Sequence, residues 1–587
     1  MLRIPNRIQA GIEKRNAMPI PPRIVLRPPS CRHLAETDSR DAWILALLVV
    51  AFALSRIVWL AVNPESAEYW EESYRWMAAH EILTGSIEPL LDYQADHYQG
   101  GSLVMIGLVM GSFLLWGESV IAMKLAAVIV SSCTLCLLYL LGRKLFGRPT
   151  AIVASLAYLA GPPLVAYWGL TVMGSHGESI LFSLAQLLIF FEIRAGRWRS
   201  PAGWALLGLV SGVGLWFCYT SGLTLIACGL AWLLWEPLPR PRELLSGSAG
   251  GLVGLVPWLL YNQRHGFVGL SRIFELFGFG SPVDPWVAQG PLEKLAILVS
   301  RDLPVGLLGP VAEALPQGLG PALILGGSAP YAIALIGSAI RVGGLWREGT
   351  GDAESRRRER VFLLYALVFL GVFLGSRFSV EPADGIVVYR LFVPPAVLLM
   401  LPAAHGVSLA WRRGGGARWA ALVGCGICLV SFATATVQLA SREIDPDDSL
   451  EIEGGYVVRG LLLHRKFERD LPRAFAVADR AEDPRMRFKV IQGIGWGFEY
   501  RFEQGGSLKA LDRYIQALPL TDRVPFVSGF RWIAGERRAQ VRARVAAGDD
   551  GSRTGTLLAR LKQLRRFADD QWERIPSEYH LVDEVSP

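Results

Sequence analysis

The chain has 587 residues, of which 52% are apolar and only 19% are charged, and its mean hydropathy is +0.33. Soluble domains carry about 25% charged residues, so this composition indicates a membrane protein. The charge is concentrated near the C-terminus, where residues 441–587 hold 25 Lys and Arg and 24 Asp and Glu. This division excludes both a single soluble enzyme and a wholly embedded transporter, and it predicts a membrane domain followed by a water-soluble domain.

Three domains are expected along the chain. Residues 1–41 are basic and proline-rich without an apolar core, which predicts a disordered cytoplasmic leader. Residues 42–440 contain eleven apolar runs long enough, or nearly so, to cross a bilayer. The predicted fold is a multi-span α-helical membrane protein of about eleven transmembrane helices, followed by a mostly α-helical soluble domain over 441–587. The runs cover residues 42–62, 119–141, 150–170, 179–193, 202–219, 222–235, 246–262, 322–340, 360–376, 387–404 and 418–440.

The basic residues between these runs predict the topology, because Lys and Arg near span ends stay in the cytoplasm. The basic leader is taken to lie in the cytoplasm. The basic loops then all fall on the cytoplasmic side only if the apolar run 101–116 does not cross the membrane. A surface-lying or re-entrant helix is therefore expected at 101–116. The outer loop 64–118 and the domain 441–587 then lie outside the cytoplasm. This topology accounts for the net charge of +7, and no nucleic-acid partner is expected. The inner loops contain Arg143-Lys144-Arg148, Arg194-Arg197-Arg199, Arg240-Arg242, Arg341 to Arg360 and Arg412-Arg413-Arg418.

The outer loop 64–100 is strongly acidic, with eight acidic residues against one basic residue, Arg75. Most of these acids are expected to be solvated. Glu71 and Glu72 differ because they lie in EESYRWMAAHEILTG, whose apolar and aromatic residues could seat a helix on the membrane surface. A carboxylate in that position is a candidate general base toward a hydroxyl group.

Several segments together carry a resemblance to a known family. EESYRWMAAHEILTG, DHYQGGSLVMIGLVMG, LLYLLGRKLFGR, PPLVAYWGLTVMGSHGES, GLVPWLLYNQRHG and VVYRLFVPPAVLLMLPAA follow one another over about residues 60–440. In order and spacing they resemble the GT-C membrane glycosyltransferases related to protein O-mannosyltransferases and the aminoarabinose lipid A transferase. The resemblance implies an enzyme of a bacterial-type inner membrane that takes a sugar from a polyprenyl-phosphate donor on the outer face and inverts the anomeric centre. A lipid, a protein and a polysaccharide all remain open as the acceptor.

The resemblance also implies catalytic residues. Those enzymes typically begin with an acidic pair in the first outer loop, and alignment on AAHEIL places this pair at Glu71 and Glu72. The first member usually acts as the general base, which nominates Glu71. The family commonly has Asp-Glu at this pair, whereas the present chain has Glu-Glu.

The departing lipid phosphate must be met by cations. The family's aromatic-Arg pair matches Tyr389-Arg390, with Arg377 a loop away, and the planar fork of Arg donates two hydrogen bonds to one phosphate. Snorkelling to the lipid headgroups is the other interpretation of Arg390, and it is the one favoured for Arg56 and Lys124. The enzyme interpretation requires Glu71 and Arg390 to face one outer cavity.

Asp96 and His97 are further substrate-binding candidates. They stand where the family often has a His-Pro-Pro segment, but this chain has HYQGG. A divalent metal ion is also considered, since carboxylate and imidazole groups are common ligands, although their spacing forms no motif. The candidate donors are Glu71, Asp96, His97, His176 and Glu178.

The C-terminal domain contains an internal echo at an offset of 36 residues, which is typical of stacked helical hairpins. The Gly-Trp segments GIGWG and GFRWIAG belong to this echo, and helix packing is favoured over glycan stacking for them. Two other functions stay open for the whole chain: a carrier or flippase for a lipid-linked substrate, and a non-catalytic membrane scaffold with a partner-binding C-terminal domain. The echo pairs Arg487, Gly493, Trp496, Arg501 and Gln504 with Arg523, Gly529, Trp532, Arg537 and Gln540.

Overall fold

The computed structural model describes most of the chain after residue 38, and these residues are helical with connecting loops and turns. Residues Met1–Leu47 and Leu48–Pro587 form two separate units, and the first contributes only the start of helix α1 to the description. The predicted leader therefore lies almost wholly outside the described residues. These are residues 39–64, 71–85, 88–276, 290–298, 326, 332–340, 353–376, 385–441, 452–467, 470–481, 483–503, 507–546, 552–577 and 579.

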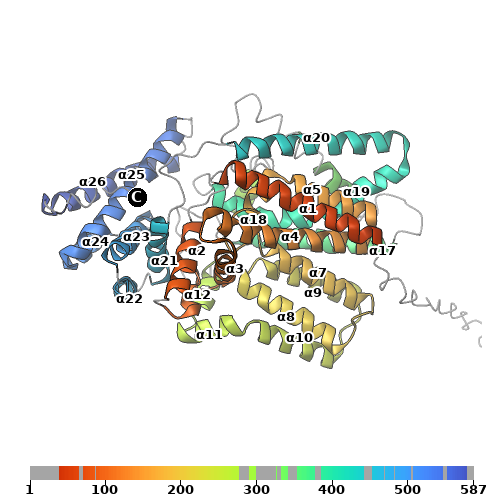
Figure 1. Ribbon diagram of the computed structural model, residues 1–587, viewed down its shortest axis with the longest axis horizontal. Coiled ribbons are helices and arrows are strands. Elements are labelled where there is room, and N and C mark those ends of the chain that lie inside the picture. The colour runs from red at the N-terminus through yellow and green to blue at the C-terminus, as the bar shows by residue number, and fades with distance from the viewer. Residues whose placement is uncertain are drawn as a thin grey trace, which may run out of the picture. The chain divides into compact units, whose positions relative to one another are not determined.

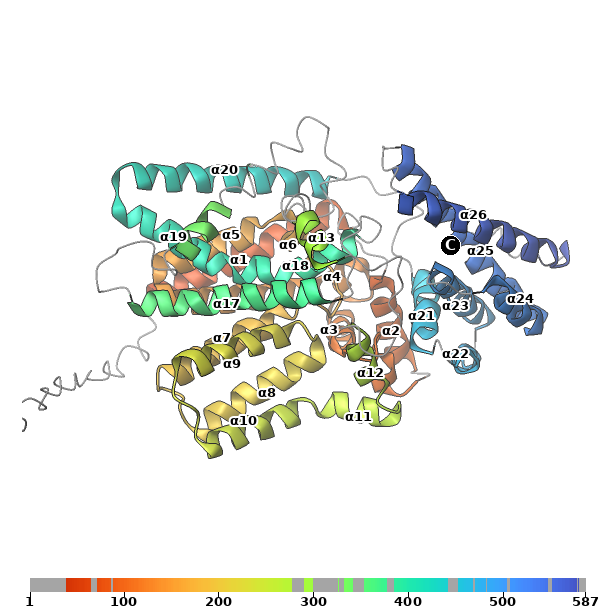
Figure 2. The same ribbon diagram turned by 180° about the vertical axis from the view of Figure 1, so that it is seen from behind.

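The apolar part of the chain is built from helices that pack lengthwise. Helix α4 packs against α5 and α7 (Figure 1), and α17, seen in front in Figure 2, packs against α9. The helices are α1 (Ser39–Val62), α2 (Glu72–Thr84), α3 (Gly101–Trp116), α4 (Val120–Phe146), α5 (Arg148–Ala160), α6 (Pro163–Trp168), α7 (Ile180–Arg194), α8 (Pro201–Phe217), α9 (Ser221–Trp235), α10 (Pro241–Gly254), α11 (Val256–Arg264), α12 (Val268–Leu276), α13 (Pro291–Ile297), α17 (Ala353–Gly375), α18 (Gly385–Leu398), α19 (Met400–Arg413) and α20 (Gly415–Ala440), with a short 3-10 helix, η4, at Leu90–Tyr93.

Among the described residues, four helices are long and apolar enough to cross a membrane, and a fifth span results if α10 and α11, which meet at a 53° bend, are counted as one. The chain is thus a multi-pass helical protein, while the count of eleven spans stays a prediction. One predicted run, 150–170, is broken between α5 and α6. The break occurs because Gly161 has a φ of +55° and is followed by Pro162 and Pro163, which cannot continue the hydrogen bonding of α5.

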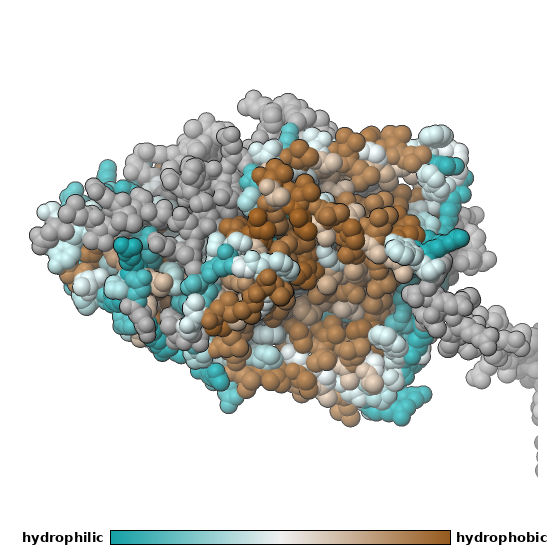
Figure 3. Space-filling model, viewed as in Figure 1, coloured by the Kyte–Doolittle hydropathy of each residue, from teal (hydrophilic) through white to brown (hydrophobic). Residues whose placement is uncertain are grey.

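The outward faces of two long helices are apolar. Val50, Leu54 and Val58 of α1 are more than half exposed, as are Val430 and Val437 of α20. Figure 3 shows apolar surface gathered over this side, with hydrophilic residues beyond its right edge. An exposed apolar surface of this extent matches a lipid environment, so these helix faces are expected to contact acyl chains.

The C-terminal domain is an array of helices in which α21 packs on α23, α23 on α25 and α25 on α26. Residues related by the offset of 36 meet at the contact of α23 with α25: Gln492 donates a hydrogen bond to Ser528 (3.3 Å), and the rings of Trp496 and Trp532 meet edge to face at 5.0 Å. The Gly-Trp segments therefore take part in helix packing. The helices are α21 (Ile452–Lys466), α22 (Leu471–Ala478), α23 (Pro484–Glu503), α24 (Leu508–Ala517), α25 (Leu520–Ala546) and α26 (Ser552–Glu573).

Candidate active site

The carboxylate of Glu71 faces two guanidinium groups at the start of α2. Its Oε2 atom lies 3.9 Å from Nη1 of Arg75 and 3.8 Å from Nη1 of Arg390. Arg75 follows one turn later on α2, whereas Arg390 comes from α18, which lies late in the sequence of the membrane domain. The side chains of Glu71 and Arg390 are 11% and 20% exposed, so both retain contact with the outside of the fold. The structure therefore brings the side chains of Glu71 and Arg390 together, while an outer cavity that both of them face stays a prediction.

Arg75 also fixes the backbone around Glu71. It is buried, and its guanidinium donates one hydrogen bond to the carbonyl of Glu71 (2.7 Å) and another to the carbonyl of Met173 (2.8 Å). From the sequence, Arg75 is expected only as the single basic residue of an acidic loop and not as part of the site. Its spacing of four residues from Glu71 on one helix was the available signal, because side chains at that spacing are neighbours.

Glu72 has a different environment from Glu71. Its side chain is fully buried, and its carboxylate contacts the ammonium of Lys124 at 2.6 Å and accepts a hydrogen bond from the backbone N–H of Val172 at 2.6 Å. A buried carboxylate needs such partners to offset its desolvation. The second acid of the pair therefore fastens α2 to α4 and to the loop before α7, and it does not reach the outer surface.

The expectation that Lys124 and Arg56 snorkel is wrong. The side chain of Lys124 is 0% exposed because the start of α4 is covered, so that its ammonium meets Glu72 instead of lipid headgroups. Arg56 is buried as well: it donates a hydrogen bond to the carbonyl of Leu159 (3.2 Å), and its guanidinium lies 4.8 Å from the ring centre of Phe52. Both cations have protein partners that the sequence does not reveal.

Glu178 organises the loop between α6 and α7. Its carboxylate accepts hydrogen bonds from the backbone N–H groups of Met173 (2.8 Å), Gly174 (2.8 Å) and Ser175 (3.1 Å). Gly174 has a φ of +67°, and a Cβ atom there would lie 2.2 Å from the carbonyl carbon of Gly101, so only glycine fits. The same loop supplies the Val172 amide and the Met173 carbonyl that hold Glu72 and Arg75.

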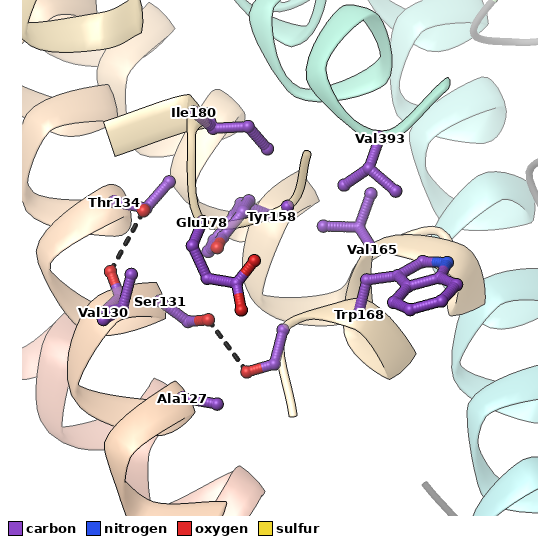
Figure 4. A pocket seen from close by; sticks show the side chains of 12 residues that line it. Ala127, Val130, Ser131, Thr134, Tyr158, Val165, Trp168, Glu178, Ile180 and Val393 are labelled. Atoms are coloured by element: carbon purple, nitrogen blue, oxygen red, sulfur yellow. Dashed lines mark hydrogen bonds between the residues drawn. The ribbon is translucent and has the colours of Figure 1, made fainter. Parts of the chain in front are cut away.

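A small cavity lies beside this loop. Figure 4 shows the side chain of Glu178 among its walls, together with Ser131, Tyr158, Trp168 and Val393. Ser131 donates a hydrogen bond to the carbonyl of Gly169 at 2.8 Å across one edge. The free volume is about 10 Å³, which is at most enough for one water molecule and far too little for a sugar. The cavity therefore belongs to the packing beneath the loop.

His97 points toward the C-terminal domain. Its Nδ1 atom lies 2.8 Å from the hydroxyl of Tyr261, and its Nε2 atom lies 2.6 Å from the backbone carbonyl of Lys466. Both ring nitrogens are thus engaged away from Glu71. The neighbouring Asp96 accepts a hydrogen bond from Gln99 at 2.9 Å.

An aromatic group lies near Arg390. The ring of Tyr219 is 5.8 Å from that of Tyr98 and 5.5 Å from that of His176. Burial, followed by the positive charge of Arg390, lowers the pKa of His176 well below its ordinary value, so the imidazole is neutral at pH 7. Burial and the nearby Asp96 raise the pKa of the Tyr98 phenol. Arg390 therefore lies near enough to Tyr98, Tyr219 and His176 to influence them electrostatically, and its guanidinium contacts the Glu71 carboxylate.

The metal candidates do not converge. Within the described parts of the chain, no three His, Cys, Asp or Glu side chains are grouped closely enough to hold a metal ion. Glu178 is taken up by backbone amides and His97 by Tyr261 and Lys466. Two further predicted residues cannot be placed in the site, since the side chain of Tyr389 and all of Arg377 lie outside the described residues.

Comparison with known proteins bears out the resemblance found in the sequence. Residues 103–261 match the family described as dolichyl-phosphate-mannose-protein mannosyltransferase. The segment contains Lys124 and the loop built on Glu178, whereas Glu71 and Arg390 lie outside it. The chain is 28% identical over 249 residues to an undecaprenyl phosphate-alpha-4-amino-4-deoxy-L-arabinose arabinosyl transferase of Pseudomonas paraeruginosa, which is 38% of this chain and 41% of that protein. It thus spans about two fifths of the length of this curated relative.

Other proteins are similar over longer stretches. An arabinosyl transferase of the same description from Pseudomonas fluorescens is 26% identical over 297 residues, which cover 46% of this chain and 50% of the relative. The crystal structure of ArnT from Cupriavidus metallidurans bound to undecaprenyl phosphate is 16% identical with a TM-score of 0.44, covering 78% of this chain and 76% of that one. An oligosaccharyltransferase from Archaeoglobus fulgidus is 12% identical with a TM-score of 0.39, covering 74% and 59%.

Proposed function

We propose that this chain is a GT-C membrane glycosyltransferase that moves a sugar from a polyprenyl-phosphate donor to an acceptor hydroxyl on the outer face of the inner membrane. The family match over residues 103–261 and the similarity to arabinosyl transferases named for undecaprenyl phosphate support this class of donor. The single observation that carries the proposal is the contact of Glu71 with Arg390, because it unites a candidate base with a candidate phosphate-binding cation. With the reaction on the outer face, the N-terminus is cytoplasmic and the C-terminal domain is extracytoplasmic.

In the proposed reaction Glu71 acts as the general base. Its carboxylate takes the proton of the acceptor hydroxyl while the hydroxyl oxygen attacks C1 of the sugar. The new C1–O bond forms on the face opposite the phosphate, so the anomeric centre is inverted in a single displacement. The bond from C1 to the phosphate oxygen breaks, and polyprenyl phosphate leaves with both electrons of that bond.

Arg390 is proposed to meet the phosphate as it gains charge. A guanidinium has five N–H donors, so it can hold the phosphate while it remains close to Glu71. Donors fixed where charge develops stabilise a transition state more than the ground state. Tyr389, Arg377 and Asp96 are proposed as further substrate contacts on the basis of the resemblance. His97, which contacts Tyr261 and Lys466, is better suited to hold the C-terminal domain, and Glu72 to anchor α2.

The proposal is tested by sugar transfer in purified membranes that contain the full chain. Wild type, Glu71→Gln and Glu573→Gln are compared at matched expression with a panel of radiolabelled polyprenyl-phosphate sugars. Glutamine keeps the size of the side chain but cannot take a proton, so Glu71→Gln is expected to lose transfer by about a hundredfold or more. Glu573 is exposed on α26, and its variant makes the same chemical change as a control.

Two results contradict the proposal. Equal transfer by wild type and Glu71→Gln excludes Glu71 as the base. Absence of transfer by wild type from every donor favours the carrier or scaffold interpretation over an enzyme. A labelled product from wild type identifies the acceptor as a lipid, a protein or a polysaccharide.

A further inference from the structure

A second group of charges lies at the opposite end of α4 from Lys124. Lys144 is twenty residues further along the same helix, which places it about 30 Å away. Around it, the ends of α4, α7 and α9 and the beginning of α17 enclose a cavity of about 240 Å³. The topology predicted from the basic loops places this cavity on the cytoplasmic side, so it is separate from the proposed glycosyltransferase site. Its basic lining residues are Lys144, Arg194, Arg197, Arg357 and Arg358.

Three carboxylates accompany these five cations, and two of the three are shared. Glu192 contacts both Lys144 and Arg197, the latter at 2.5 Å. Glu354 contacts Arg194 at 3.2 Å and Arg358 at 3.2 Å. Glu236 contacts Arg194 at 2.6 Å. Counted with every group ionised, five positive and three negative charges leave an excess of two positive charges around the cavity.

The helix ends reduce this excess without removing it. Each helix end is equivalent to about half a charge, negative at a C-terminus and positive at an N-terminus. Three C-terminal ends and one N-terminal end supply about one negative charge, so about one positive charge remains. Arg194 and Lys144 contact carboxylates in the floor, where their side chains are only 10% and 13% exposed, so the excess lies toward the exposed rim, where Arg357 is one of the lining cations.

The surroundings of the cavity favour an anion attached to an apolar chain. Leu145 and Phe191 belong to the lining. Leu233 and Leu234, which precede Glu236 on α9, are 65% and 63% exposed. A phosphodiester carries one negative charge, which equals the excess, and the acyl chains of a phospholipid would lie along such apolar residues. Basic pockets between membrane helices on the cytoplasmic side are known to hold anionic headgroups.

We propose that this cavity binds the phosphodiester headgroup of an anionic phospholipid from the cytoplasmic leaflet. Lys144 and Arg194 contact the phosphate from the floor, and Arg197, Arg357 and Arg358 close over it from the rim. The bound lipid joins α4, α7, α9 and α17 at one point. Its role is independent of the sugar-transfer chemistry, which takes place at the other end of α4.

The test uses the full chain in phosphatidylcholine nanodiscs with and without phosphatidylglycerol. Native mass spectrometry after release from the disc measures the retained phosphatidylglycerol. Arg197→Gln with Arg357→Gln removes two rim charges and leaves Lys144 and Arg194 in place. Glu192, which Arg197 shares with Lys144, keeps its contact with Lys144. Arg199→Gln with Arg242→Gln is the matched control, because these residues are exposed on the same predicted side but do not line the cavity.

Wild type and the control are expected to retain one phosphatidylglycerol, and the rim variant is expected to bind it at least about tenfold more weakly. An unchanged thermal unfolding midpoint of the rim variant in pure phosphatidylcholine shows that it is folded. Equal retention by the rim variant and the control overturns the proposal. A third result would identify the ligand as free phosphate and overturn the assignment to a lipid. In that case wild type retains no lipid, and inorganic phosphate raises the unfolding midpoint of wild type but not that of the rim variant.

Discussion

Arg459 of α21 donates hydrogen bonds from Nη1 to both carboxylate oxygens of Glu81 in α2, at 2.6 and 2.8 Å. Its Nη2 atom lies 3.3 Å from Glu88, and Tyr93 donates a further hydrogen bond to Glu81 at 2.8 Å. These side chains are almost fully buried. The C-terminal domain is thereby joined to the helix that begins with Glu71, so the position of the candidate base depends on residues nearly four hundred positions later in the chain.

Replacement of Arg459 should release α2 from the C-terminal domain. Arg459→Met leaves the Glu81 carboxylate buried without its cation, and breaking a buried pair from one side costs about 3–5 kcal/mol. The double variant Arg459→Met with Glu81→Leu should recover part of this loss, because it removes both charges. Thermal unfolding of the full chain in detergent measures both effects. A single variant as stable as wild type would show that the contact does not hold the two parts together.

Replacement of Glu72 should affect stability in a way that replacement of Glu71 does not. Glu72→Gln takes from the buried ammonium of Lys124 the carboxylate that it contacts at 2.6 Å, which is expected to cost about 3–5 kcal/mol. Among the described residues, the carboxylate of Glu71 has only long contacts, to Arg75 and Arg390, so Glu71→Gln should change the unfolding midpoint little. Lys124→Met combined with Glu72→Leu should be more stable than Glu72→Gln alone. If both single variants unfold at the wild-type midpoint, the assignment of Glu72 as an anchor is wrong.

Sugar transfer is expected to require Arg390. The planar guanidinium should matter in addition to its positive charge. Arg390→Gln should lower kcat by about a hundredfold, since loss of one donor from a developing oxyanion has effects of this size. Arg390→Lys keeps the positive charge but loses the planar fork, so it should recover only part of the activity. Steady-state kinetics with a polyprenyl-phosphate sugar measure both variants. Full activity of Arg390→Gln would show that Arg390 does not bind the phosphate and would favour the interpretation that it snorkels to the lipid headgroups.

The pKa of His176 predicts a dependence of stability on pH. Burial lowers this pKa in the folded chain, whereas an unfolded histidine titrates near about 6.5. The unfolded state therefore binds more protons below that pH, and stability should fall as the pH is lowered from 7 to 5, by up to about 1.4 kcal/mol per pH unit. His176→Gln cannot titrate and should show a smaller slope. The free energy of unfolding measured at several pH values compares the two, and equal slopes would show that another group is responsible.

Much of the helical part of the fold could be predicted from the sequence, because lipid imposes long apolar runs on a spanning helix. The residue types after Glu71 predict a helix, and the resemblance implies that Glu71 and Arg390 lie close together. The partner of Lys124 could not be found in this way, since Glu72 is 52 residues earlier and nothing local links the two. The same holds for Arg459 and Glu81: a buried ion pair between distant helices leaves no periodic signal in the sequence.

The glycines that begin α3 should be sensitive to the addition of a single methyl group. A Cβ atom at Gly101 would lie 2.0 Å from the carbonyl oxygen of Gly174 and 2.6 Å from that of Phe217, so the loops beside the candidate site must separate. Gly101→Ala is expected to cost about 1–3 kcal/mol and to lower sugar transfer, because the displaced loop holds Arg75 and Glu72. Gly107→Ala is the matched control on the same helix, where a Cβ atom meets nothing within 4 Å and alanine should stabilise the helix by about 0.5–1 kcal/mol. Thermal unfolding and transfer assays on the two variants distinguish a local clash from a general effect of alanine, and equal behaviour of both would show that the loops are not in close contact.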